Sequence, residues 1–213
     1  MANSDSHGRS PGLRLLAVWR ALAIPENELF NPDVHLPNIL ARELLCARAA
    51  HGSPADAPDL AGVYALFYNG PSPLYRPISS PDWLIPIYIG STDGSLTQRL
   101  RNHFESIKAG AGIEPDQFRY RFLQLSPDRH RGVERLLTVW FRPVWNGTGF
   151  GAKVHGVHRQ GQETSLWDTW HPGRTGRGGL ARPAPAAKLA LQQRLQRSQD
   201  AMRQALGDDW DQP

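Results

Sequence analysis

Cysteine is almost absent from this sequence, since Cys46 is the only one among 213 residues. A single cysteine forms no disulfide within the chain, and it cannot supply a four-cysteine zinc site, a RING domain or an iron–sulfur cluster. Long apolar runs are also missing, and residues 1–11 are polar, without the apolar centre of a secretion signal. We therefore expect a soluble protein of a reducing cytoplasm.

Neither sign of charge dominates the chain as a whole, whose net charge is only +4. The sequence pI of about 9.6 nevertheless suits a partner with a phosphate backbone. The basic excess is concentrated between residues 153 and 194, where seven basic residues stand against two acidic ones. Hydrophobic residues make up 40% of the chain, which is enough for a folded core without disulfides.

The first 60 residues contain one polar segment, two helical patterns and a loop. Residues 1–12 are rich in Ser, Gly and Asn, which predicts disorder, and residues 13–24 carry apolar side chains at helical spacing. A second helix is predicted over residues 38–49. Residues 51–59 combine Gly, Ser, Pro and Asp as linkers and long loops do, so we expect the main domain to begin after them.

Two short apolar segments follow, residues 62–68 and 85–89. Both are rich in aromatic and β-branched residues and are flanked by turn formers, which predicts two strands. Beyond them lies a predicted helix, with Ser95 or Asp93 available as its N-cap. Its buried face is expected to consist of Leu96, Leu100, Phe104 and Ile107.

The second half of the chain adds one strand and two helices. Residues 117–125 alternate between aromatic and basic side chains, which predicts a half-exposed third strand. Residues 133–141 are a predicted helix that Pro143 stops. Residues 146–179 are Gly-rich and predicted to be mostly loop, whereas residues 188–206 favour a helix. The arginines of that last helix are expected to form a solvated face: Arg194, Arg197 and Arg203.

Polar residues occur in a particular order along these elements. The first predicted strand carries Gly-x-Tyr, the second Tyr-x-Gly, the next helix an Arg and a His, and the following helix a Glu that precedes an Asn. The positions are Gly62-Val63-Tyr64, Tyr88-Ile89-Gly90, Arg99, His103, Glu134 and Asn146. Each has a common structural explanation by itself, because strand aromatics are usually core and a Glu at a helix start usually faces the backbone amides. Together, the order resembles the GIY-YIG nuclease superfamily.

Three further features resemble its type II restriction endonuclease branch: the His four residues after the Arg, PVWN at residues 143–146, and WDTWHPGR at residues 167–174. The resemblance covers about residues 60–150. It implies an α/β (α+β) GIY-YIG fold, in which a three-stranded antiparallel sheet is flanked by helices, with N- and C-terminal helical arms. We expect residues 1–59 to form the N-terminal arm and helices, residues 60–150 the catalytic core, and residues 151–213 a DNA-contacting loop region and C-terminal helix.

The resemblance also implies the reaction, which is hydrolysis of phosphodiester bonds in both strands of duplex DNA at a short, GC-rich palindromic site. An activated water is the expected nucleophile. Glu134 is the single acid among the motif positions, which argues for one metal ion, because two-metal sites usually need several carboxylates. A hard oxygen ligand, with water and phosphate completing the shell, suits Mg²⁺, for which Mn²⁺ can substitute.

The family pattern suggests a role for each motif residue. Arg99 has the permanently charged fork that matches a phosphate, and His103 lies on the same helix face. Tyr64 is the general base in the family picture, although an unperturbed phenol has a pKa of about 10 and needs a neighbour that favours its ionised form. His103 remains the alternative base. Tyr88 would hold the water or the phosphate, and Asn146 would fix the geometry of its loop.

The basic, glycine-rich region after residue 150 is expected to contact DNA, since Arg and Gln suit base edges and Lys suits phosphates. Arg101 is the alternative to Arg99 as the phosphate clamp, although the spacing to His103 favours Arg99. His155 and His158 have no Cys or carboxylate at zinc-ligand spacing, so we do not expect zinc there. The candidate DNA contacts are Arg101, Lys153, His155, Arg159, Gln162, His171 and Arg174.

Cutting both strands of a palindrome with one active site per chain calls for a twofold-related homodimer on double-stranded DNA. The resemblance implies a cognate DNA methyltransferase that protects the host without binding the enzyme, and a prokaryotic cytoplasm as the setting. A repair or homing nuclease of the GIY-YIG type is one alternative, although such families usually carry separate DNA-binding or zinc domains. A catalytically inactive DNA-binding module is the other, and the intact motif positions speak against it.

Overall fold

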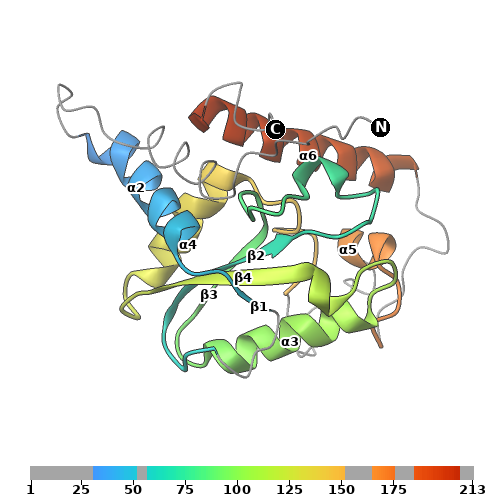
Figure 1. Cartoon of the computed structure of the whole chain (residues 1–213), viewed down its shortest axis with the longest axis horizontal. Coiled ribbons are helices and arrows are strands. Elements are labelled where there is room, and N and C mark those ends of the chain that lie inside the picture. The colour runs from blue at the N-terminus through green and yellow to red at the C-terminus, as the bar shows by residue number, and fades with distance from the viewer. Residues whose placement is uncertain (1–30, 52–56, 152–164, 176–184, 207–213) are drawn as a thin grey trace, which may run out of the picture.

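The computed structural model describes residues 31–51, 57–151, 165–175 and 185–206. Within them, antiparallel strands form one sheet in the order β1-β4-β2-β3 (Figure 1). Three long strands confirm the predicted three-stranded antiparallel sheet, and β1 adds a two-residue pairing at the free edge of β4. The strands are β1 (Ala50–His51), β2 (Gly62–Tyr68), β3 (Pro86–Thr92) and β4 (Phe118–Gln124).

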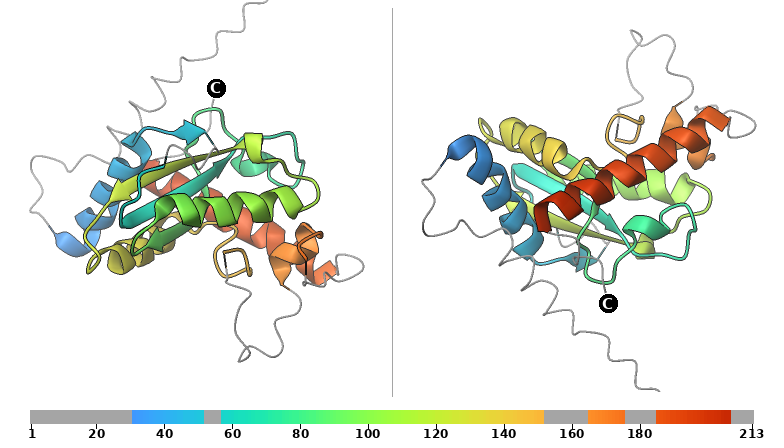
Figure 2. Two further views of the ribbon diagram at one scale, coloured as in Figure 1. Left: turned by 90° about the horizontal axis from the view of Figure 1, so that it is seen from below. Right: turned by 90° about the horizontal axis from the view of Figure 1, so that it is seen from above.

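Helices flank both faces of the sheet, which confirms the α+β fold class. Figure 2 shows α3 in front of the sheet when the molecule is seen from below, and α6 in front when it is seen from above. None of the helices in the described ranges is both long and apolar enough to cross a membrane. The helices are α2 (Pro32–Cys46), α3 (Leu96–Ala109), α4 (His130–Phe141), α5 (Leu166–Trp170) and α6 (Pro185–Leu206), with 3-10 turns η2 (Arg76–Ile78) and η3 (Pro115–Gln117).

Strand β2 is the centre of the fold, and all of its residues are buried. Its continuous apolar sequence suits this place, because β3 and β4 flank it and helices cover the sheet. The register pairs Tyr64 with Gly90 and Leu66 with Tyr88 across β2 and β3. The antiparallel pairing therefore brings the Gly-x-Tyr and Tyr-x-Gly tripeptides side by side.

Helix α2 begins at Pro32 rather than near residue 38, because the side chain of Asn31 caps its first turn. Asn31 Oδ1 accepts a hydrogen bond from the Asp33 amide at 3.1 Å. Proline is favourable in the first turn of a helix, where its missing N–H removes no helical bond. The helix ends at Cys46, three residues before the predicted end.

The partial exposure of β4 agrees with the predicted half-exposed strand, but the packing of α2 against it buries one residue of the predicted exposed face, Arg121. Arg121 on β4 is buried, and its guanidinium lies 5.1 Å from the centre of the Phe67 ring. It donates hydrogen bonds to the carbonyl oxygen of Leu45 on α2 and, at 3.3 Å, to that of Asp82. Burial lowers the pKa of Arg121 to about 10. The alternation of side chains predicted a strand but not the helix that contacts Arg121.

Capping residues and a proline set the ends of the two helices that carry motif residues, α3 and α4. Ser95, and not Asp93, caps α3, and its Oγ accepts from the Gln98 amide at 3.1 Å. The predicted apolar face of α3 is buried. Helix α4 starts at His130, three residues before the predicted start, and ends at Phe141, followed by the C-cap Arg142, whose φ of 49° is left-handed. Pro143 follows and cannot continue the helix.

The C-terminal region contributes more regular structure than its composition predicts. Helix α5 lies within the segment predicted to be loop, where Ser165 caps it by accepting from the Asp168 amide at 3.1 Å. Its Trp167 packs edge-on against Trp145, with ring centres 5.7 Å apart. Helix α6 begins at Pro185, slightly before the predicted residue 188. The predictions for residues 1–12 and 13–24 lie outside the described residues.

Candidate active site

Three motif side chains meet at the hydroxyl of Tyr64, in the middle of β2. The Tyr64 oxygen lies 2.6 Å from His103 Nε2 and accepts a hydrogen bond from Arg99 Nε at 3.1 Å. Arg99 and His103 reach it from one face of α3 because they are one helical turn apart. Arg99 can only donate to this oxygen, and His103 Nε2 accepts the Tyr64 hydroxyl proton in the imidazole tautomer that is protonated on Nδ1.

Aromatic rings and glycines pack closely around this centre. Tyr88 on β3 lies edge-on to His103, with ring centres 5.1 Å apart, and Phe150 stacks on the imidazole at 4.9 Å while its ring centre is 5.0 Å from that of Tyr88. A Cβ on Gly90 would lie 2.6 Å from the Tyr64 hydroxyl oxygen. A Cβ on Gly151, whose φ is +70°, would lie 2.5 Å from that of Tyr88. Both glycines are needed for these side chains to approach one another.

Burial determines the protonation states in this cluster. It raises the pKa of Tyr64 well above its usual value; nearby Tyr88 raises it further, and Arg99 opposes the shift. Burial also lowers the pKa of His103 to about 3, helped by the positive charges of Arg99 and Arg174. At neutral pH Tyr64 is therefore a phenol that is hydrogen-bonded to a neutral imidazole.

The buried, neutral imidazole of His103 makes the stability of the protein depend on pH. An unfolded chain protonates histidine near pH 6.5, whereas His103 in the folded chain stays neutral down to about pH 3. The free energy of unfolding should therefore fall as the pH drops below 6.5, by about 1.4 kcal/mol per pH unit for this one group. Above pH 6.5 this contribution should be constant.

Urea unfolding at several pH values between 4 and 8 would measure this effect. His103→Gln keeps an acceptor for Tyr64 but cannot titrate. Below pH 6.5 its free energy of unfolding should therefore fall less steeply than that of the wild type, by about 1.4 kcal/mol per pH unit. Equal slopes for the two proteins would show that His103 is not held neutral in the folded state.

Glu134 lies in the second turn of α4, which packs beside the edge strand β3. Its carboxylate accepts a short hydrogen bond from the hydroxyl of Ser91, the residue that directly follows Gly90 on β3. Within the described residues, no cluster of three or more His, Cys, Asp or Glu side chains forms a ready metal site. A partly buried carboxylate beside a hydroxyl fits one hard cation whose other ligands are water and phosphate.

Ser91 was not among the residues selected from the sequence. Its position directly after Tyr-x-Gly was the available signal, but spacing alone could not indicate that it meets a residue 43 positions later. The strand register makes the difference, because it turns the Ser91 side chain towards α4.

Asn146 binds the backbone of β3 through its side chain. Its Oδ1 accepts from the Ile89 amide at 2.9 Å, and its Nδ2 donates to the Ile89 carbonyl at 2.8 Å. The next strand contact is made by the Trp145 amide, which donates to the Ile87 carbonyl at 2.9 Å. The loop after α4 thus satisfies the outer edge of β3 and holds Tyr88 and Gly90 in place.

His171, a predicted DNA contact, is fully buried instead. Its Nε2 lies 2.5 Å from the Tyr75 hydroxyl and its Nδ1 lies 2.9 Å from the Ala111 carbonyl oxygen. Burial is the main cause that lowers its pKa to about 4. A side chain with no exposed surface and both nitrogens engaged cannot reach DNA, so the prediction is wrong and His171 belongs to the core.

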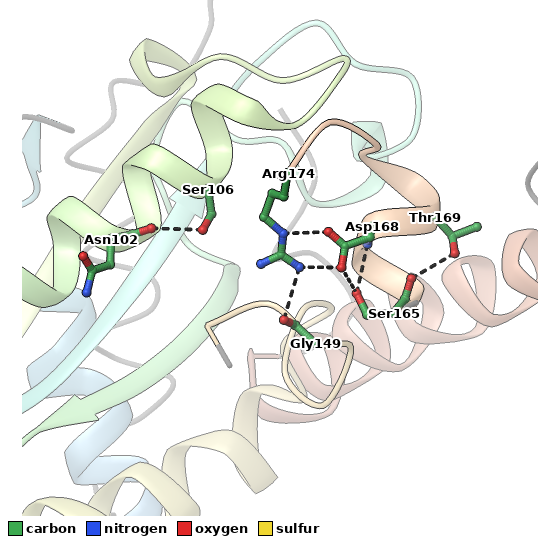
Figure 3. A network of polar contacts seen from close by, with 7 residues as sticks. All are labelled: Asn102, Ser106, Gly149, Ser165, Asp168, Thr169 and Arg174. Atoms are coloured by element: carbon green, nitrogen blue, oxygen red, sulfur yellow. Dashed lines mark hydrogen bonds and ion pairs between the residues drawn. The ribbon is translucent and has the colours of Figure 1, made fainter. Parts of the chain in front are cut away.

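Arg174 is likewise engaged within the protein (Figure 3). Its Nε and Nη2 each lie 2.6 Å from a carboxylate oxygen of Asp168, and the side chain is only 8% exposed. Nη2 also donates to the Gly149 carbonyl at 3.4 Å, and the guanidinium lies 4.4 Å from the Trp167 ring centre. The predicted DNA contact is replaced by a structural one, since Arg174 holds the turn that carries Phe150 against His103.

The remaining DNA-contact predictions have different outcomes. Arg101 is exposed on α3, two residues after Arg99 and turned away from Tyr64, and its Nη1 donates to Gln98 at 3.4 Å. It stays available to a partner. Four candidates lie outside the described residues: Lys153, His155, Arg159 and Gln162.

The fold and this cluster define a nuclease domain of the GIY-YIG class, with the two tripeptides on neighbouring strands and the Arg, His, Glu and Asn arranged around them. A family model described as the Eco29kI GIY-YIG domain matches residues 91–199, just over half of the chain. The chain therefore belongs to this family of type II restriction endonuclease GIY-YIG domains. Its match begins directly after Gly90, so it includes the four later motif positions but neither tripeptide. No curated protein matches the chain.

Proposed function

We propose that this protein is a type II restriction endonuclease that hydrolyses phosphodiester bonds in both strands of duplex DNA at a short, GC-rich palindromic site. The observation that carries the proposal is the convergence of Arg99 and His103 on the Tyr64 hydroxyl, beside Tyr88. Such a cluster combines a phosphate-binding cation with a proton path. The family match supports the nuclease class and the restriction branch.

Arg99 is the proposed clamp for the phosphate that is cut. A guanidinium has five N–H donors, so Arg99 keeps donors for phosphate oxygens after it has bonded Tyr64 and the Gly151 carbonyl, the latter at 3.3 Å. These two bonds hold the guanidinium in position before DNA arrives. A positioned positive charge stabilises the negative charge that develops on the phosphate oxygens.

Tyr64 and His103 form the proposed proton path. As the water oxygen bonds to phosphorus and the strand's leaving oxygen departs, Tyr64 takes the water proton and passes its own hydroxyl proton to His103 Nε2. Tyr64 then acts without ever becoming a free phenolate, which its raised pKa disfavours. The low pKa of His103 opposes this transfer in the free protein. A DNA phosphate near Arg99 would raise that pKa, since a nearby negative charge favours the imidazolium.

We propose Glu134 as the ligand for one Mg²⁺ per active site, with Mn²⁺ as a substitute. The Ser91 hydroxyl would fix the orientation of this carboxylate. When bound, such an ion supplies positive charge beside the phosphate and the leaving oxygen. Tyr88 is close to both the proposed phosphate clamp and the proposed metal ligand, because the charge of Arg99 lowers the pKa of its hydroxyl and the charge of Glu134 raises it.

Two chains related by a twofold axis would place one active site on each strand of a palindrome, so we propose a homodimer on DNA. A DNA methyltransferase of the same specificity would protect the host, in the cytoplasm of a prokaryote. Analytical ultracentrifugation of the protein with its cognate duplex should give the mass of two chains per duplex. One chain per cleaved duplex would refute the dimer.

The test of the function is incubation of purified protein with plasmid and bacteriophage DNA and Mg²⁺, with an EDTA control. Discrete fragments that require the metal would support the proposal and allow the recognition site to be mapped. Cleavage of branched DNA alone would favour a repair nuclease. DNA binding without cleavage under any metal would favour an inactive binding module.

A further inference from the structure

Three arginines line a cleft of about 420 Å³ between the end of α4 and the middle of α6. One guanidinium comes from the C-cap of α4 and two come from α6, which is far away in the sequence, and none of the lining residues is acidic. We call this cleft the arginine pocket. Its lining residues are Thr138, Arg142, Pro143, Asn146, Arg194 and Arg197.

The arginines share this cleft, and among the residues that the structure describes no carboxylate forms an ion pair with Arg142, Arg194 or Arg197. Arg194 Nη1 donates to the carbonyl oxygens of Asn146, at 2.8 Å, and Val144, at 3.3 Å. Arg197, one turn further along α6, is close enough that its positive charge adds to burial in lowering the pKa of Arg194. Clustered arginines without carboxylates favour an anion, and phosphate above all.

The arginine pocket lies on the same helix as the proposed metal ligand. Glu134 and Thr138 are four residues apart and lie along one side of α4, and Arg142 follows the helix as its C-cap. The rise of an α-helix puts the Cα atoms of Glu134 and Arg142 about 12 Å apart. One DNA strand presents a phosphate for every 3.4 Å or so of helix axis. A duplex cut beside Glu134 therefore has phosphates within reach of the pocket.

A direct contact also joins the pocket to the catalytic strand. Arg194 binds the main chain of Asn146, whose side chain binds both backbone groups of Ile89. Ile89 stands between Tyr88 and Gly90. An anion bound by Arg194 would thus be linked to the strand that carries Tyr88 through two sets of hydrogen bonds, from Arg194 to Asn146 and from Asn146 to Ile89.

We propose that the arginine pocket binds a backbone phosphate of duplex DNA a few nucleotides from the phosphate that is cut. The inference rests on the proposed function, because it assumes that DNA lies along α4. It gives a role to Arg194 and Arg197, which the sequence pattern assigned to a solvated face. The contact carries no base information, and it positions the duplex relative to the active site.

Fluorescence anisotropy with a labelled duplex in EDTA tests the proposal, because DNA is not cut there. Arg197→Gln removes an arginine that lines the pocket, and Arg203→Gln is its matched control. Each variant removes one positive charge from α6, but Arg203 lies outside the pocket and pairs with Asp200. We expect Arg142→Gln/Arg197→Gln to weaken binding by about tenfold or more, and to lower the slope of log affinity against log salt by about 0.9 for each arginine. Arg203→Gln should leave both unchanged.

The result separates this proposal from the proposed function. If the wild type cuts DNA and the pocket variants bind as tightly as it does, the pocket assignment is overturned and the nuclease assignment stands. Equal losses of DNA affinity in Arg197→Gln and Arg203→Gln would also overturn it, because they would show that the affinity depends on the net charge of the protein and not on the pocket. A wild type that neither binds nor cuts duplex DNA would overturn both. Thermal unfolding of each variant would show that a loss of binding is not a loss of fold.

Discussion

Glu134→Gln should reduce DNA cleavage by at least about a hundredfold, while the affinity for duplex DNA stays close to that of the wild type. Glutamine keeps the shape of the side chain and an oxygen that can accept from Ser91. It loses the negative charge that would hold a metal ion. Cleavage of plasmid DNA under single-turnover conditions gives the rate, and anisotropy in EDTA gives the affinity.

Ser91→Ala is the companion variant, because it leaves the carboxylate and removes its hydrogen-bond donor. We expect a smaller loss of cleavage that additional Mg²⁺ largely restores, since the ligand remains but is less well oriented. Mn²⁺ titration followed by electron paramagnetic resonance gives a readout besides activity, and should show tighter binding to the wild type than to Glu134→Gln. A Glu134→Gln protein that cuts at the wild-type rate would show that another residue holds the metal.

Arg99→Gln should lower the cleavage rate by about a hundredfold or more, and Arg101→Gln by much less. The two residues are two positions apart on α3, and each substitution removes one positive charge from the same helix. Arg99 bonds the Tyr64 hydroxyl and the Gly151 carbonyl, whereas Arg101 is exposed and its guanidinium donates to the side chain of Gln98. The pair therefore separates a positioned phosphate clamp from a general contribution of charge to DNA binding.

Single-turnover cleavage and duplex affinity should be measured together for both variants. The loss in Arg99→Gln should appear mainly in the cleavage rate, because the charge acts most strongly when negative charge develops on the phosphate. Arg99→Lys should recover only part of it, since an ammonium lacks the planar fork. If Arg101→Gln were the more damaging change, the phosphate clamp would have to be reassigned to Arg101.

Local sequence features predicted the elements that carry the site. Strand β2 spans the predicted residues 62–68, because an uninterrupted apolar segment between turn formers suits a central strand. Ser95 caps α3 as its side chain allows, and the four-residue spacing of Arg99 and His103 puts them on one helix face. These properties depend on neighbours in the chain, so they can be inferred without knowing the fold.

Contacts between distant segments were beyond such inference. The burial of Arg121 depends on α2, and that of His171 on Tyr75, which lies 96 positions away. Polar residues within a motif were assumed to face a ligand, but His171 and Arg174 face the interior. Composition alone cannot distinguish an arginine that contacts DNA from one that holds a turn through a buried carboxylate.

The sequence by itself determined the family, the strands and helices of the core, and the set of motif residues, because each of these follows from residue order and short-range spacing. Only the tertiary structure decided that Tyr64 meets His103, that Ser91 meets Glu134, and that arginines from the C-terminal end of α4 and from α6 share one cleft. The physical reason is that sheet register and helix packing set which side chains meet, and these depend on contacts across the whole folded chain.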